Sequence, residues 1–137
     1  MKLIQSLLAG VAALCIGASA YAASTEIAGV KVEDSITIAG TKLPLNGAGI
    51  RYRGPFKVYV CDLYASKHVS TLEELVAAPG PKRLTMTMLR EIESGPFGKL
   101  LTRGMEDNNS KADMSKLVPG LLRMSDIFSA HKSLNPG

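Results

Sequence analysis

The residues best suited to bind a small polar group lie in two short stretches of the chain. The first, residues 46–51 (NGAGIR), ends in Arg51, whose guanidinium offers a planar fork of donors that matches a carboxylate. The second, residues 57–64 (KVYVCDLY), carries the phenol of Tyr59. On residue type alone, a solvated surface arginine beside Arg53 and Lys57 and a half-buried strand aromatic remain the alternatives.

Arg51 and Tyr59 can act together only if the chain between them is irregular. Side chains alternate across a strand. A two-residue turn at Gly54-Pro55 therefore pairs Arg51 with Val58 and leaves the phenol on the other face. An odd loop or a bulge near Phe56 pairs Arg51 with Tyr59 on one face instead. A joint role of the two residues requires that irregularity.

Signatures of catalysis and of metal binding are nearly absent. Neither His68 nor His131 lies at metal-ligand spacing from another His, Asp or Cys, so we expect both on the surface. The acidic residues 106–109 (EDNN) lack the glycine and the distal glutamate of a calcium loop. Neither a glycine-rich phosphate loop nor a nucleophile elbow occurs. The sequence therefore predicts no catalytic residue, no metal site and no cofactor.

The first residues of the chain have the composition of a secretory signal peptide. Lys2 precedes an apolar stretch, residues 3–20, that is too interrupted for a bilayer-spanning helix of about 20 strongly apolar residues. Ala20-Tyr21-Ala22 is a small-x-small cleavage site. We therefore predict residues 1–22 as the signal and residues 23–137 as the mature domain, periplasmic or secreted and without stable membrane insertion after cleavage. A buried N-terminal helix or a retained anchor is the alternative.

The mature part has the size and composition of one domain with one core. The chain is 46% hydrophobic, which makes stability by apolar packing plausible. Cys61 is the one cysteine after cleavage, so the mature domain holds no intramolecular disulfide, and we expect a buried core thiol. The net charge of +4 is mild, and neither a clustered basic patch nor a motif indicates nucleic acid as a partner.

Hydrophobic periodicity predicts strands first and helices last. Alternating or apolar runs predict strands over residues 30–38, 41–45, 50–53, 56–65 and 84–89, with breaks at residues 39–40 and 46–49. A capping box from Ser70 to Glu73 and apolar stripes predict helices over residues 71–78, from Ser94 through Met105, and around Leu117 to Phe128. Asn108-Asn109 interrupts the last two. Residues 24–29 are expected as a frayed start. Without βαβ alternation, this order indicates an α+β fold, an antiparallel sheet covered by helices on one face.

With these motifs the sequence resembles the chalcone isomerase-like family, in particular its bacterial exported branch. The resemblance is carried by LNGAGIR, FKVYVCDLY, PKRLTMTML and SGPFGKLL, and it spans roughly residues 32–128. It implies the chalcone isomerase-like fold for most of the mature chain. It also implies one of the two activities of that family.

Plant chalcone isomerases close a flavanone ring with an Arg, a Thr, a Tyr and an Asn, whereas relatives with the same fold bind fatty acids through the Arg and a Tyr. The family Arg corresponds to Arg51, and the isomerase Thr falls on Tyr59, which is the substitution found in fatty-acid binders. The isomerase Tyr and Asn fall near Phe97 and Gly104, which offer neither hydroxyl nor amide. The resemblance thus implies that Arg51 and Tyr59 are ligand-binding residues.

The function expected from this resemblance is that of an exported, non-catalytic binding protein for a fatty acid or a similar amphipathic carboxylate. Four methionines could line an adaptable slot for the tail: Met86, Met88, Met105 and Met124. The alternatives are a chalcone isomerase-like intramolecular lyase or isomerase on an unknown substrate, and an envelope interaction protein or a vestigial one.

Family members continue with strands that complete the sheet, whereas this chain stops at Gly137. We expect from this a domain that is incomplete at its C-terminal side: a truncated gene product, a fragment or a degenerate member. An unpaired sheet edge predicts self-association or pairing with a partner strand. The expected partners are therefore an amphipathic carboxylate and a second copy of the chain.

Overall fold

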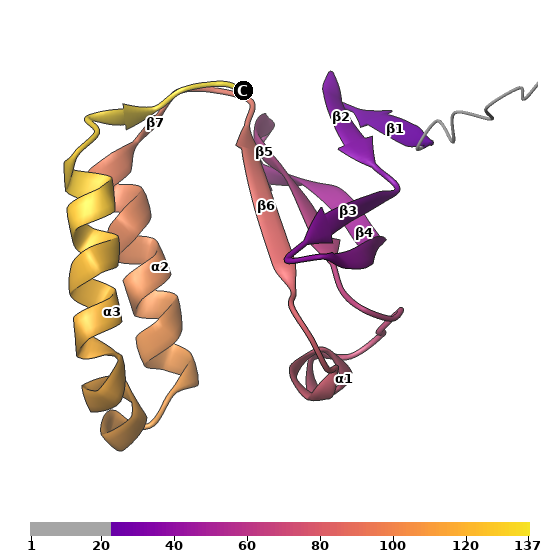
Figure 1. Cartoon of the computed structure of the whole chain (residues 1–137). Coiled ribbons are helices and arrows are strands. Elements are labelled where there is room, and N and C mark those ends of the chain that lie inside the picture. Colours follow the sequence, from indigo (N-terminus) through magenta and orange to yellow (C-terminus); the bar gives the residue numbers. More distant parts are fainter. Residues whose placement is uncertain (1–22) are drawn as a thin grey trace, which may run out of the picture.

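The centre of the molecule is a four-stranded antiparallel sheet in the order β3-β4-β5-β6 (Figure 1). The computed structural model describes residues 23–137, and the predicted signal peptide lies outside them. The strands of the sheet are β3 (Ser35–Ile38), β4 (Thr41–Arg53), β5 (Phe56–Tyr64) and β6 (Arg83–Met88). Two further antiparallel ladders join β1 (Ser24–Ile27) to β2 (Val30–Glu33), and β7 (Ile92–Glu93) to β8 (Ser133–Leu134). The helices are α1 (Leu72–Ala77), α2 (Ser94–Asn108) and α3 (Lys111–Ser129). The predicted α+β class is confirmed.

The two N-terminal hairpins, β1–β2 and β3–β4, both turn on an Ala-Gly dipeptide. Ala28 and Gly29 have φ angles of 50° and 81°, and Ala39 and Gly40 have φ angles of 47° and 77°. Positive φ at both central residues is the geometry whose twist matches the flanking strands. The turn at Ala39-Gly40 is where the sequence predicts it. Residues 24–29, expected as a frayed start, instead form β1 and its turn, because pairing with β2 orders them.

Strand β4 runs without interruption through residues 46–49, where the sequence predicts a break. The ladder with β5 shifts its register between Leu45 and Gly47, so Asn46 is the extra residue of a bulge. The Asn46 side chain is held by one loop residue: its Oδ1 accepts from Val69 N at 2.8 Å and its Nδ2 donates to Val69 O at 3.1 Å. The glycine-rich stretch therefore marks a bulge in a continuous strand rather than an end.

One face of the sheet is closed. This closed face carries Leu43, Val60 and Tyr64, which are all buried. The β1–β2 hairpin lies on the same side (Figure 1), where Val32 is also buried. The Tyr64 hydroxyl donates a hydrogen bond of 3.0 Å to the Glu33 carbonyl at the end of β2. The apolar core of the domain therefore lies between the sheet and its own N-terminal hairpin.

Helices α2 and α3 form an antiparallel pair on the opposite side of the sheet (Figure 1). They meet at Phe128, whose carbonyl accepts from Ser94 Oγ at 2.7 Å. Gly98 is buried there, and a β-carbon on it would lie only 2.9 Å from the Phe128 ring. Elsewhere the helices are loosely covered, since Leu100 and Leu122 are 65% and 62% exposed. The prediction of helices on one face is confirmed, but neither helix adds a fully buried large apolar side chain.

Helix α1 begins with a capping box one residue later than predicted. Its N-cap is Thr71, whose hydroxyl accepts from Glu74 N at 3.1 Å. The Glu74 carboxylate in turn accepts from Ser70 N at 2.7 Å. The prediction paired Ser70 with Glu73 and was wrong by one position. The capping-box pattern accepts either Ser or Thr followed three residues later by Glu, so the sequence fits both Ser70 with Glu73 and Thr71 with Glu74.

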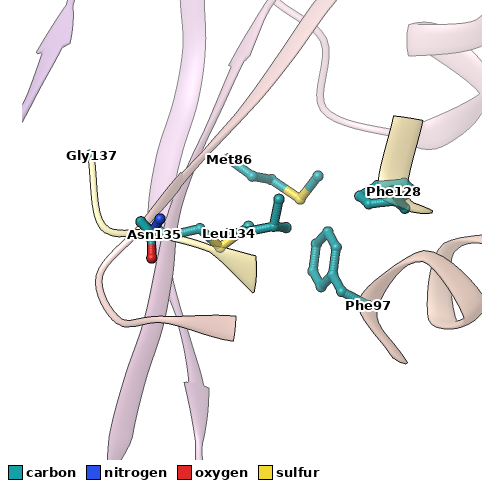
Figure 2. Close-up of a pocket in the computed structure, with 7 residues that line it drawn as sticks. Met86, Phe97, Phe128, Leu134, Asn135 and Gly137 are labelled. Atoms are coloured by element: carbon teal, nitrogen blue, oxygen red, sulfur yellow. The ribbon is translucent and has the colours of Figure 1, made fainter. Parts of the chain in front are cut away.

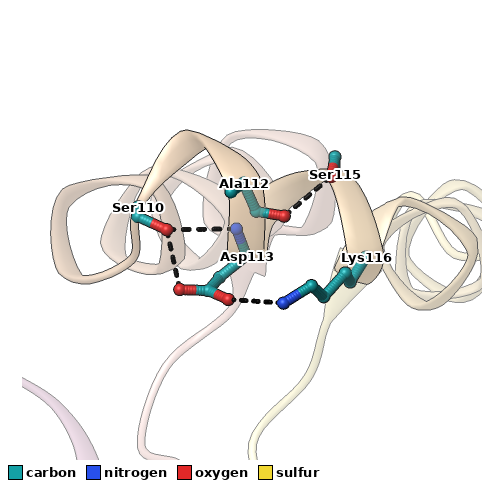
Figure 3. Close-up of polar contacts among 5 residues, drawn as sticks. All are labelled: Ser110, Ala112, Asp113, Ser115 and Lys116. Carbon is teal, nitrogen blue, oxygen red and sulfur yellow. Dashed lines mark hydrogen bonds and ion pairs between the residues drawn. The ribbon is translucent and has the colours of Figure 1, made fainter.

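The N-cap of helix α3 is Ser110 (Figure 3). It directly follows the predicted interruption at Asn108-Asn109. The Ser110 hydroxyl accepts from Asp113 N at 3.1 Å and donates to Asp113 Oδ2 at 2.7 Å. Lys116 Nζ lies 3.0 Å from the other carboxylate oxygen. The Ser110 hydroxyl, and then the Lys116 ammonium, lower the pKa of Asp113. This cap fixes the sharp reversal between α2 and α3.

After α3 the chain returns to the sheet. Ser94 N donates to Lys132 O at 3.2 Å, and β8 then pairs with β7. Gly137 N donates to Met88 O at 3.2 Å, at the end of β6. The C-terminal segment thus connects the helix pair to the outer edge of the sheet.

Candidate functional site

Arg51 and Tyr59 are direct cross-strand partners in the β4–β5 ladder. Tyr52 pairs with Lys57, so a regular register would pair Arg51 with Val58. The ladder instead shifts between Arg51 and Tyr52 and leaves Val58 as the extra residue of a bulge. Direct partners point to the same face of a sheet. The irregularity that a joint role requires is therefore present.

The sheet face that carries Arg51 and Tyr59, here the open face, continues across β6. Three rows of cross-strand partners define it: Arg51, Tyr59 and Met88; Gly49, Cys61 and Met86; Gly47, Leu63 and Leu84. A β-carbon built on Gly47 or Gly49 would meet no atom within 4 Å. The two glycines thus leave free space in front of β4, directly beside Arg51.

Helix α2 reaches the open face through Phe97. The rings of Tyr59 and Phe97 meet edge to face, with 6.4 Å between centroids and 83° between planes. Phe97 makes a second edge contact with Phe128 of α3, at 5.9 Å and 66°. Such pairs stabilise by about 0.5–1.5 kcal/mol beyond area burial. The aromatic chain therefore fixes Tyr59 against the base of the helix pair.

A cavity of about 330 Å³ lies between β6 and the two helices (Figure 2). Its walls are mainly apolar side chains and the C-terminal segment: Met86, Met88, Phe97, Phe128, Leu134, Asn135 and Gly137. The volume is at the lower end of the range of small-molecule sites. Of the four methionines expected at a slot, Met86 and Met88 line this cavity. Met124 lies in a smaller groove between α2 and α3, and Met105 is exposed.

The predicted head-group residues stand beside this cavity without lining it. Tyr59 contacts two of the lining residues, Met88 across the ladder and Phe97 edge to face. Arg51 lies one strand further away and is exposed. Phe97, where the isomerase tyrosine is expected, does reach Tyr59 and brings no hydroxyl. Gly104 is exposed two turns further along α2. A β-carbon built on it would meet no atom within 4 Å.

The open face also carries Cys61, in the row next to Tyr59. Its side chain is half-buried, and burial, followed by the neighbouring charge of Asp62, raises the pKa of the thiol. A thiol with a raised pKa stays protonated and is a weak nucleophile. Cys61 therefore contributes apolar surface to the open face. A buried core thiol was expected, and the side chain is only half-buried.

The closed face holds a polar pair that the sequence analysis did not single out, Asp62 and Tyr64. Both are buried, at 7% and 2% exposure. Burial first, then the Asp62 carboxylate, raises the pKa of Tyr64 to about 12. The sequence signal that could have indicated this buried pair is the aspartate inside the apolar run VCDLY. Because β5 alternates, this pair faces away from Arg51 and Tyr59 and belongs to the core.

Neither histidine lines the cavity. His68 and His131 are both exposed, as expected. Within residues 23–137, no three or more His, Cys, Asp or Glu side chains are grouped as a metal site would need. In the same range, the helices are too short or too polar to cross a membrane.

Comparison with known proteins agrees with the architecture. No curated protein matches the chain. The sequence matches the profile of a family described as chalcone isomerase-like, and the match covers residues 24–137, which includes every strand and helix of the structure. The chain belongs to the chalcone isomerase-like family.

Proposed function

We propose that this protein binds a fatty acid or a similar amphipathic carboxylate on the open face, with Arg51 and Tyr59 at the head group. The bulge at Val58 is the observation that supports this most, because it makes the two residues direct partners on one face. Both side chains are then available to one acid at the end of an apolar surface. A regular hairpin would have separated them.

The energetics favour a tail-driven ligand. A charge-assisted hydrogen bond to the guanidinium contributes about 1.5–3 kcal/mol net. About ten buried methylenes contribute roughly 8 kcal/mol before ordering costs. The tail would run from Arg51 along the free space at Gly49 or past Tyr59 toward the methionine-lined cavity. The head group therefore sets orientation, and the apolar surface supplies most of the affinity.

Binding is a better proposal than isomerisation because the open face is poor in donors. Ring closure needs positioned donors at the developing oxyanion. Phe97 occupies the place expected for a catalytic tyrosine and only extends the aromatic contacts of Tyr59. The neighbouring side chains on β6, Met86 and Met88, donate nothing.

Native mass spectrometry tests this proposal with two single-residue variants. Protein purified from cells that express the full chain is expected to carry a lipid-sized adduct in the wild type, and in Arg51→Ala a markedly smaller fraction of the molecules should carry it. Arg53→Ala is the matched control, since Arg53 is an equally exposed arginine on the same strand, and it should keep the adduct. An empty wild type, or equal loss in both variants, would contradict the proposal.

The protein mass in the same spectrum also tests whether the signal peptide is removed during the proposed export. We infer from residues 1–22 that the chain is delivered to the periplasm or secreted, so the purified protein should have the mass of residues 23–137. The mass of the intact chain would overturn this.

A second candidate function, self-association, is favoured by the position of β6. This strand lies at the end of the four-stranded sheet, and in the described part of the chain its outer edge receives one backbone hydrogen bond, from Gly137 N. Exposed edges template pairing with another strand. We propose that two copies pair through β6.

Light scattering at increasing concentration tests the pairing. The wild type should approach twice the monomer mass, and Leu84→Lys should stay monomeric, because a lysine on an edge strand opposes pairing. Leu84 is 59% exposed, so the variant should fold. Leu100→Lys, at 65% exposure on α2, is the control and should still dimerise. A monomeric wild type would refute this candidate.

A further inference from the structure

The tip of the β4–β5 hairpin is exposed on both faces. Every residue from 51 to 57 is exposed, including the turn at Gly54-Pro55. Two of these residues are large aromatics, Tyr52 at 49% and Phe56 at 56% exposure. Consecutive cross-strand pairs point to opposite faces, so Tyr52 and Phe56 lie on opposite sides of the tip. Packing within the domain therefore leaves about half of each ring exposed to solvent.

Each ring has a cation as its cross-strand partner. Lys57 is the cross-strand partner of Tyr52, and Arg53 is the partner of Phe56. Arg90, which follows β6, places its guanidinium carbon 4.7 Å from the centroid of the Phe56 ring. In the part of the chain that the structure describes, none of these three cations forms an ion pair.

The tip is correspondingly poor in negative charge. Residues 49–61 contain no aspartate or glutamate. The nearest carboxylate along the chain from Arg90 is that of Glu91, which is exposed. The surface thus combines a net positive charge with two exposed aromatic rings.

We propose that the β4–β5 tip, residues 51–57 with Arg90, docks on an anionic lipid surface. Cations near an anionic membrane are attracted to its surface potential, and aromatic rings favour the headgroup region. An acidic protein would satisfy the cations without requiring an exposed ring on each side of the turn. Arg51 belongs to this tip and its partner Tyr59 follows it on β5, so docking would bring the open face to the source of an amphipathic ligand.

This proposal does not depend on the ligand proposal. Vesicles free of fatty acid measure docking, and native mass spectrometry of the purified protein measures the bound ligand. Failure of either measurement leaves the other standing.

A single tryptophan can report docking, since the chain contains none. In Phe56→Trp, emission should shift to the blue with phosphatidylcholine vesicles that contain phosphatidylglycerol, and not with phosphatidylcholine alone. The shift should weaken as salt is raised, because salt screens the attraction. Ile127→Trp, at 64% exposure on α3, is the matched control and should not respond. A response of Ile127→Trp without one of Phe56→Trp would assign the contact to the helix pair and overturn the proposal.

Charge reversal provides the second test. Arg53→Glu with Lys57→Glu should weaken partitioning to the anionic vesicles by on the order of tenfold or more. Lys111→Glu with Arg123→Glu changes the net charge equally, on exposed positions of α3, and should partition like the wild type. Equal loss of partitioning in both double variants would show that net charge alone drives binding to the vesicles, and would overturn the proposal. Binding of the tip to soluble polyglutamate in preference to vesicles would identify an acidic protein as the partner instead.

Discussion

Tyr59 and Tyr64 lie five positions apart on one strand and have opposite roles because they face opposite sides of the sheet. Tyr59 is half-buried on the open face, next to Arg51 and edge-on to Phe97. Tyr64 is 2% exposed on the closed face, with its hydroxyl on the Glu33 carbonyl. The alternation of β5 therefore separates a phenol that is available to a ligand from one that is part of the core.

The buried phenol predicts a loss of stability at high pH. Burial, then Asp62, raises the pKa of Tyr64 to about 12, above its ordinary value of 10.0. A pKa raised on folding means that the unfolded chain releases the proton first, so the stabilisation is complete below pH 10 and disappears as the pH rises toward 12. The expected loss is of the order of 1–3 kcal/mol.

Urea unfolding between pH 8 and pH 12 measures this loss in the wild type and in Tyr64→Phe. The variant should be less stable at pH 8 by about 1 kcal/mol, because the Glu33 carbonyl loses its donor. Its free energy of unfolding should fall less steeply with pH than that of the wild type. Parallel pH profiles would show that Tyr64 does not titrate differently in the folded and unfolded states.

At the scale of elements, two bulges in β4–β5 place the site. Asn46 is the extra residue of the first and Val58 of the second. The second makes partners of Arg51 and Tyr59, and the first keeps Gly47 and Gly49 in a continuous strand beside them. Helices α2 and α3 approach this strand pair mainly through Phe97, and their contact with each other is tightest at Gly98.

The contact at Gly98 predicts opposite effects of two glycine substitutions in α2. Gly98→Ala should destabilise the protein by about 1–3 kcal/mol, since the new β-carbon lies 2.9 Å from a Phe128 ring carbon that Phe97 also packs against. Gly104→Ala should stabilise it by about 0.5–1 kcal/mol, because the position is helical and open. Thermal unfolding of both variants checks the pair. Stabilisation by Gly98→Ala would mean that the helices separate freely.

The sequence predicted elements better than it predicted their irregularities. Alternation identified β5 and β6, and capping and stripe patterns identified the three helices, because these signals repeat over many residues. The strand β1 was missed since four residues carry too little periodicity. The stretch 46–49 was read as a break, because a bulge and a turn both favour glycine. The pairing of Arg51 with Tyr59 could only be stated as a condition, since the sequence does not fix the register of a hairpin that contains a bulge.

At the scale of the whole molecule, the sheet separates a core from an open surface. The β1–β2 hairpin closes one face, and α2 and α3 stand over the other (Figure 1). Apolar side chains of the two helices, such as Leu100 and Leu122, are exposed. The apolar lining of the cavity and the free space at the glycines lie on that second face. The buried core and the proposed ligand site therefore lie on different faces of the same four strands.

The central claim, that Arg51 and Tyr59 hold a carboxylate, is tested most directly by NMR of palmitate labelled with carbon-13 at the carboxyl group. When the pH is lowered, the bound acid should stay ionised to a lower pH in the wild type than in Arg51→Ala, because the guanidinium favours the charged form. Tyr59→Phe should give an intermediate titration, and Arg53→Ala should titrate like the wild type. Identical titration of the bound carboxyl group in the wild type and in Arg51→Ala would contradict the claim.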